Sequence, residues 1–182
     1  MSSHFQGSGP RSNAYSESKF TNWAVYDPFF AEARIALKRF DSKIPEAPAF
    51  PYVIALPPQA DVFMHPCTRS QVLEKLERLL PESIKDLRAV FLLAGTRKQE
   101  RSWRSQLGCY GIYWARCVFL CAPLFNWHVA RRDGWRDFYL DDVLVHEIAH
   151  HADRQRLANK KTKEAFAHAY VQKEAILAKK RC

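Results

Sequence analysis

The sequence predicts an α+β fold, with a short mixed β-sheet, a supporting helix or two, a helix carrying a candidate active site and a C-terminal helix. Short apolar runs bounded by Gly, Pro or charged residues are typical of buried strands, and apolar residues spaced three and four apart are typical of helices. The chain has 182 residues, of which 47% are hydrophobic. This is enough apolar material for one compact domain.

The N-terminal part of the chain divides into a polar leader and the start of the domain. Met1–Ser18 is polar and rich in Gly and Ser, so we expect a mobile leader, followed by a single domain over residues 19–182. Asp27-Pro28 predicts a helix start, with Asp as the cap and Pro at the first helical position. Apolar residues then recur at helical spacing up to Phe40.

Two strands and a helix are expected in the middle of the chain. Tyr52–Leu56 predicts a short strand within a Pro-rich segment, and Ala89–Ala94 predicts a buried strand that ends at Gly95. Between them, leucines at helical spacing predict an amphipathic helix over about Ser70–Leu80.

The C-terminal half begins with two apolar segments, Leu107–Trp114 and Cys117–Leu124, which predict either a hairpin or one longer bent strand. Asp137 is a reasonable N-cap for a helix that continues past His151. A last helix is expected over about Thr162–Lys179.

Charge, the length of the apolar runs and cysteine content indicate which binding partners and which compartment to expect. The net charge is +9, and the segment from Arg154 to Cys182 holds nine basic and two acidic residues. This segment is either a solvated helix face or a weakly indicated site for nucleic acid or an acidic protein. No run is long enough to cross a membrane and no secretion signal is present, so we expect a cytoplasmic protein. The five cysteines form no CxxC pair and are expected to be mostly free thiols.

The segment His146-Glu147-Ile148-Ala149-His150 is an HExxH motif in an apolar helical context. Residues four apart lie on one face of a helix, so His146 and His150 can offer two imidazoles to one zinc ion. Zinc lowers the pKa of water towards neutrality, and Glu147 can take the proton as a general base.

A catalytic zinc needs a third protein ligand. The extended pattern HExxHxxGxxH would supply a third His at position 156. This chain has Arg156 there, so the pattern is absent. Glu164, near the start of the next helix, is the better candidate, and His168 one turn later is either a supporting partner or a substitute ligand. Glu174 is a weaker candidate for the third ligand, because its position relative to Glu164 places it on a different face of the helix.

HEIAHHAD followed by EAFAHAY resembles the gluzincin zinc metallopeptidases, closest in pattern to the catalytic-domain family of anthrax lethal factor. The resemblance covers about His146–Val171. It implies a zincin-like fold, Zn²⁺ held by His146, His150 and Glu164, Glu147 as general base, and hydrolysis of a protein or peptide substrate. His168 stands where the family commonly has an acidic residue that orients the first His. Asp153 either takes over that role or caps the helix end.

The same resemblance implies an edge strand that binds extended substrate, for which the two apolar segments before the motif are candidates. Tyr110, Tyr113 and Tyr170 are candidates for stabilising an oxyanion, although each one singly is better explained as a core or strand-surface aromatic residue. The rival interpretation is a non-catalytic zincin-like module with structural zinc, whose basic C-terminus binds nucleic acid or an acidic protein. Oligomeric state is not predicted.

Overall fold

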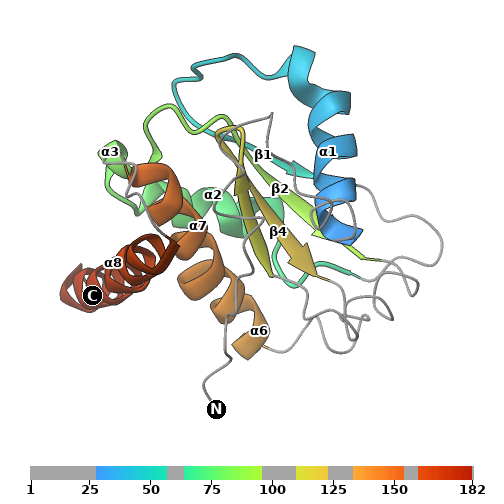
Figure 1. Ribbon diagram of the computed structural model, residues 1–182. Helices are drawn as coiled ribbons and strands as arrows, with labels where there is room; N and C mark the ends of the chain where they lie inside the picture. Colours follow the sequence, from blue (N-terminus) through green and yellow to red (C-terminus); the bar gives the residue numbers. More distant parts are fainter. Residues whose placement is uncertain (1–27, 57–63, 96–109, 123–132, 154–159, 182) are drawn as a thin grey trace.

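The computed structural model describes residues 28–56, 64–95, 110–122, 133–153 and 160–181. The expected leader, Met1–Ser18, lies outside the described residues. The described part of the chain has an α+β architecture around one mixed sheet, which agrees with the coarse fold class that the sequence predicts (Figure 1). None of its helices combines the length and the apolar content that a membrane span requires.

The described residues form a four-stranded sheet in the order β1-β2-β4-β3. The strands are β1 (Tyr52–Ala55), β2 (Ala89–Ala94), β3 (Gly111–Trp114) and β4 (Cys117–Ala122). β1, β2 and β4 are parallel, whereas β3 is antiparallel to β4 and forms one edge. β3 and β4 are joined by a tight turn at Ala115 and Arg116, both with positive φ, so the hairpin alternative is confirmed and the bent strand is wrong.

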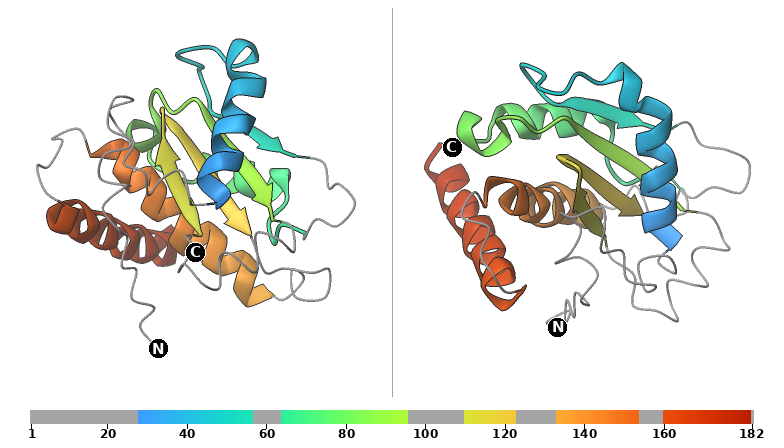
Figure 2. Two further views of the ribbon diagram at one scale, coloured as in Figure 1. Left: turned by 45° about the vertical axis from the view of Figure 1, so that its right-hand side comes forward. Right: turned by 45° about the horizontal axis from the view of Figure 1, so that its top comes forward.

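The two central strands are buried on both faces, which explains why they are continuous apolar runs. Phe91 and Phe119 stack with ring centroids 4.9 Å apart on the face covered by α1. Val90 and Leu120 point to the other face, into a second core cluster with the helix that carries the HExxH motif. Figure 2 shows the resulting layers, with α1 on one side of the sheet and α7 and α8 on the other.

The N-terminal helices match the predicted positions with one difference. α1 spans Pro28–Phe40, and α2 spans Arg69–Glu77, where Thr68 forms a capping box with Gln71. The expected helix over Ser70–Leu80 therefore ends early. Pro81 starts a separate short helix, α3 (Pro81–Ile84), because proline suits a first helical position but not a helix interior.

The C-terminal half is helical over a longer range than expected. α6 (Asp133–Asp137), a π-helical stretch η3 (Phe138–Val143) and α7 (Leu144–Ala152) follow one another without a break, and α8 spans Lys160–Arg181. The prediction that Asp137 is an N-cap is wrong. It lies inside this helical run with helical backbone angles, and its carboxylate pairs with Arg136 instead.

Candidate metal centre

The HExxH segment lies on α7, which is anchored by its apolar face. Leu144, Val145, Ile148 and Ala149 are fully buried against the sheet and α8, while His146 and His150 are only partly buried. Because these two histidines are one turn apart, their rings point to the same side of the helix. Their Nε2 atoms lie 3.1 Å from each other.

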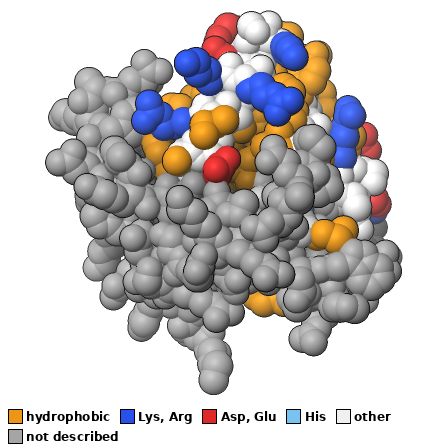
Figure 3. Space-filling view, turned by 90° about the vertical axis from the view of Figure 1, so that its right-hand side faces the viewer, with side chains coloured by type: hydrophobic (Ala, Val, Ile, Leu, Met, Phe, Trp, Pro, Cys, Tyr) orange, Lys and Arg blue, Asp and Glu red, His pale blue; other side chains and the backbone are white. Residues whose placement is uncertain are grey.

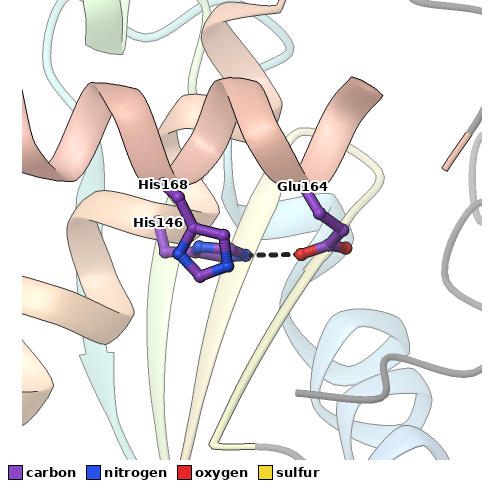
Figure 4. Close-up of side chains that lie close together, drawn as sticks. All are labelled: His146, Glu164 and His168. Atoms are coloured by element: carbon purple, nitrogen blue, oxygen red, sulfur yellow. Dashed lines mark ion pairs between the residues drawn. The ribbon is translucent and has the colours of Figure 1, made fainter. Parts of the chain in front are cut away.

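Glu164 reaches this pair from α8. Its Oε2 lies 3.2 Å from Nε2 of His146, and its Oε1 lies 3.8 Å from Nε2 of His150. Figure 4 shows the carboxylate directed at the His146 ring from the neighbouring helix. The structure therefore brings together three side chains that the sequence singled out.

The separations of these donor atoms can be compared with those around a metal ion. Zinc–nitrogen and zinc–oxygen bonds of about 2.0–2.2 Å at tetrahedral angles place neighbouring donor atoms about 3.3–3.5 Å apart. The three observed separations of 3.1, 3.2 and 3.8 Å bracket that value. Two imidazoles and a carboxylate are also a donor set that zinc accepts, so the residues present fit this ion.

His168 belongs to the same cluster. Nitrogen or oxygen atoms of His146, Glu164 and His168 all lie within 4.8 Å of one another, and the His168 ring lies edge-on to His146 at a centroid distance of 5.2 Å (Figure 4). Unlike the other donors, His168 is exposed. Glu164 thus contacts both motif histidines at their Nε2 atoms, and His168 stands beside it as a further donor.

Burial favours the neutral form of His150, which is the form that can bind a metal ion. Removal from solvent lowers the pKa of His150, an effect that the negative charge of Glu147 partly opposes. The ring is consequently held neutral near pH 7, with a lone pair available for an ion.

Glu147 packs against the edge strand of the sheet. The residue is only 7% exposed, and a Cβ built on Gly111 would lie 2.7 Å from both Cγ and Oε1 of its side chain. Such a contact is far inside van der Waals distance, so only glycine fits opposite this carboxylate. The glycine was not among the predicted site residues, although a glycine within an apolar strand is a sequence signal for close approach.

β3 presents backbone hydrogen-bonding groups beside Glu147. The amide of Cys121 donates to the carbonyl of Tyr110 at 2.7 Å, so alternation along the antiparallel pair turns the backbone groups of Ile112 and Trp114 towards β4. The N–H and C=O groups of Gly111 and Tyr113 then face away from the sheet. Among the described residues, no strand pairs with that edge.

Tyr113 is engaged with a histidine that is not a donor in the cluster. Its hydroxyl lies 2.9 Å from Nδ1 of His151, and Nε2 of His151 lies 2.7 Å from the carbonyl of Lys85. Because a carbonyl only accepts, Nε2 of His151 carries the proton and Nδ1 accepts from the phenol. Burial raises the pKa of Tyr113 to about 12, so the hydroxyl stays protonated. These bonds tie β3 and α7 to the segment before β2.

The other predicted supporting residues have packing roles. Tyr110 lies in an aromatic cluster with Phe138 and Tyr139, and the hydroxyl of Tyr170 donates to Ser83 on α3. Asp153 is the C-cap of α7, and its backbone N–H donates to the carbonyl of Ala149 at 2.9 Å. A role for Tyr110 or Tyr170 in stabilising an oxyanion stays a prediction.

Glu174 does not join the cluster. It is buried on α8, ten residues and about 15 Å along the helix axis from Glu164. Cys117 and Cys121 are buried free thiols on the α1 side of the sheet, in agreement with the expected core role.

No family model, curated protein or solved structure matches this chain. The case for a function therefore depends on the geometry of the His146, His150 and Glu164 cluster and on the position of Glu147 beside it.

Proposed function

We propose that this protein is a zinc-dependent peptidase that hydrolyses a peptide bond by attack of water, with Glu147 as the general base. One observation carries the proposal. Two imidazole nitrogens and the two oxygens of one carboxylate, from two helices, converge with separations of 3.1–3.8 Å, and Glu147 next to the first histidine is buried. The resemblance of the motif region to gluzincins supports the same conclusion.

His146, His150 and Glu164 would hold the ion. Zinc, when bound, supplies a Lewis acid that polarises a carbonyl and makes water a stronger acid. Glu147 accepts the proton from water and returns it to the leaving amine. Its side chain packs on the backbone of Gly111, and this contact restricts the positions that the carboxylate can take.

The outer edge of β3, with which no strand of the described residues pairs, would align the substrate. An extended peptide can pair with the outward-facing backbone groups of Gly111 and Tyr113 as an additional strand. Since Glu147 packs on Gly111, the peptide backbone would pass beside the general base. Backbone pairing does not depend on side chains, which suits a protein or peptide substrate.

The test combines zinc content and hydrolysis of casein in three variants. His146→Ala is expected to lose stoichiometric zinc, whereas Glu147→Gln keeps it and loses at least about a hundredfold in activity. His151→Ala is the matched control for zinc content and is expected to keep the ion, because it removes an adjacent imidazole that bonds to Tyr113 and Lys85 instead. Zinc retained by His146→Ala would contradict the ligand assignment, and full activity of Glu147→Gln would contradict the base.

A second candidate is a non-catalytic module with structural zinc, favoured by the position of His168 as a fourth donor. Four protein ligands close a zinc site and leave no position for water. The cobalt-substituted protein separates the two candidates, because His168→Ala changes the absorption spectrum of a closed site and not that of an open one. Salt-dependent DNA binding without casein cleavage would favour the structural module.

A further inference from the structure

A groove of about 550 Å³ runs along the side of α1, on the face of the sheet opposite to α7. Its lining includes Arg34, Ile35 and Lys38 from α1 and Trp114 from the edge strand. All three α1 residues are exposed, and Ile35 retains 61% of its surface. Figure 3 shows Lys and Arg side chains around hydrophobic ones over this part of the molecule. The groove therefore combines an apolar floor with basic walls.

The groove is continuous with the edge to which the substrate would bind. Trp114 is the last residue of β3, three residues and about 10 Å from Gly111. Gly111 and Tyr113 face α7, whereas Ile112 and Trp114 face α1. A strand added to β3 has the same alternation, because side chains at paired positions share a face. Its residue opposite Trp114 would thus enter the groove.

The charge of the groove selects the side chain that enters. Arg34 and Lys38 contribute two positive charges, separated by one turn of α1. Asp41 also lines the groove, but its carboxylate pairs with the buried Arg88 at 2.8 Å. A carboxylate with an apolar stem can meet the basic groups while its methylene groups pack on Trp114 and Ile35.

We propose that the groove between α1 and Trp114 is a specificity subsite for an acidic residue, preferably Glu, of an extended polypeptide bound along β3. In an antiparallel arrangement, this residue lies three positions N-terminal to the one opposite Gly111. The inference deepens the proposed function by naming a feature of the substrate, and it depends on strand binding at that same site.

The test measures binding, so that it does not depend on hydrolysis. Fluorescently labelled extended peptides, identical except for Glu, Gln or Lys at one position, are titrated by anisotropy against Glu147→Gln protein. Moving the substituted position along the peptide locates the subsite. At one position, the Glu peptide is expected to bind roughly tenfold more tightly than the Lys peptide, because the basic groove attracts the carboxylate and repels the ammonium group.

Charge reversal at the subsite supplies the control. Arg34→Glu/Lys38→Glu is expected to reverse the order of the Glu and Lys peptides at that position. Arg39→Glu/Lys43→Glu makes the same change on exposed residues that do not line the groove, and should leave the order unchanged. Equal binding of all peptides, no peptide binding, or the same loss in both double variants would overturn the inference. Acid-selective binding without casein cleavage would instead count against the peptidase proposal alone.

Discussion

Gly111 leaves room for two side chains of the helical run that carries the motif, because a methyl group at this position would lie 2.7 Å from the Glu147 side chain and 2.8 Å from Cγ1 of Val143. Gly111→Ala is expected to keep zinc and to lower kcat about 10–100-fold, since a displacement of about 1 Å at a catalytic group has an effect of that size. Zinc content and steady-state kinetics check this.

A double-mutant cycle shows whether the effect passes through the carboxylate. In the Glu147→Gln background, Gly111→Ala should cause little further loss of activity, because the base is already absent. Additive losses would mean that Gly111 acts by another route, through its contact with Val143 or on the substrate strand.

His65 makes the stability of the fold sensitive to acid. Its Nδ1 accepts from the amide of Cys67 at 3.0 Å, its ring packs edge-on against Tyr139, and burial lowers the pKa of His65 to about 4. The folded pKa lies below the ordinary value of 6.5, so the unfolded chain binds the proton more tightly. Stability is therefore lost as the pH falls from about 6.5 to 4.

His65→Asn removes the titrating group and keeps an acceptor for the Cys67 amide. Between pH 7 and pH 4, wild type is expected to lose roughly 3 kcal/mol more free energy of unfolding than this variant, by the linkage of a pKa shift to stability. Urea denaturation at a series of pH values measures the difference. Parallel pH profiles for the two proteins would show that His65 is not the group responsible.

At the scale of elements, Arg88 connects the start of β2 to the turn after α1. Its guanidinium, almost fully buried, donates to the carbonyls of Ile44 and Pro45 and pairs with Asp41 at 2.8 Å. Arg88→Met is expected to cost about 2–3 kcal/mol, because it leaves buried carbonyls without donors.

Urea denaturation checks the loss, with Arg78→Met as the matched control. Arg78 forms an ion pair with Glu74 in which both side chains are more than half exposed, so its loss should change stability by less than about 1 kcal/mol. Equal effects of the two substitutions would contradict the structural role of Arg88.

At the scale of the whole molecule, the donor cluster joins α7 to α8. Among the side chains described on α8, only Ala167 and Glu174 are buried, and Tyr170 and Val171 pack against the core while partly exposed. Zinc at a hundred times its dissociation constant should raise the free energy of unfolding by about 2.7 kcal/mol. Thermal unfolding with zinc and with a chelator measures this.

Glu164→Gln should reduce the stabilisation by zinc, because the amide replaces a charged ligand, and Glu77→Gln, an exposed change on α2, should not. A chelator that leaves the unfolding temperature of wild type unchanged would contradict a metal link between α7 and α8.

The sequence predicts the elements of this molecule better than their arrangement. Ala89–Ala94 is a strand both in the prediction and in the structure, because a strand that is buried on both faces consists of a short apolar run. The spacing of His146, His150 and Glu164 predicts donors that do converge. The contact between Gly111 and Glu147 could not be predicted, because it depends on sheet order, which pairs distant segments.

The π-helical stretch before the motif was also not predicted. It determines to which side of α7 the side chains of His146 and His150 point. The amide of Leu144 donates to the carbonyl of Tyr139, five residues earlier. The hydroxyl of Tyr139 donates to the carbonyl of Cys121 on β4, which anchors this stretch to the sheet. A π-turn contains one residue more than an α-turn, so deleting Leu140 would restore a regular α-helix and keep the residues after it in the same orientation relative to that anchor. His146 and His150 would then still face Glu164, whereas deleting Val145 from the regular α-helix would rotate them by about 100° relative to the residues before it and erase the centre while sparing every residue in it.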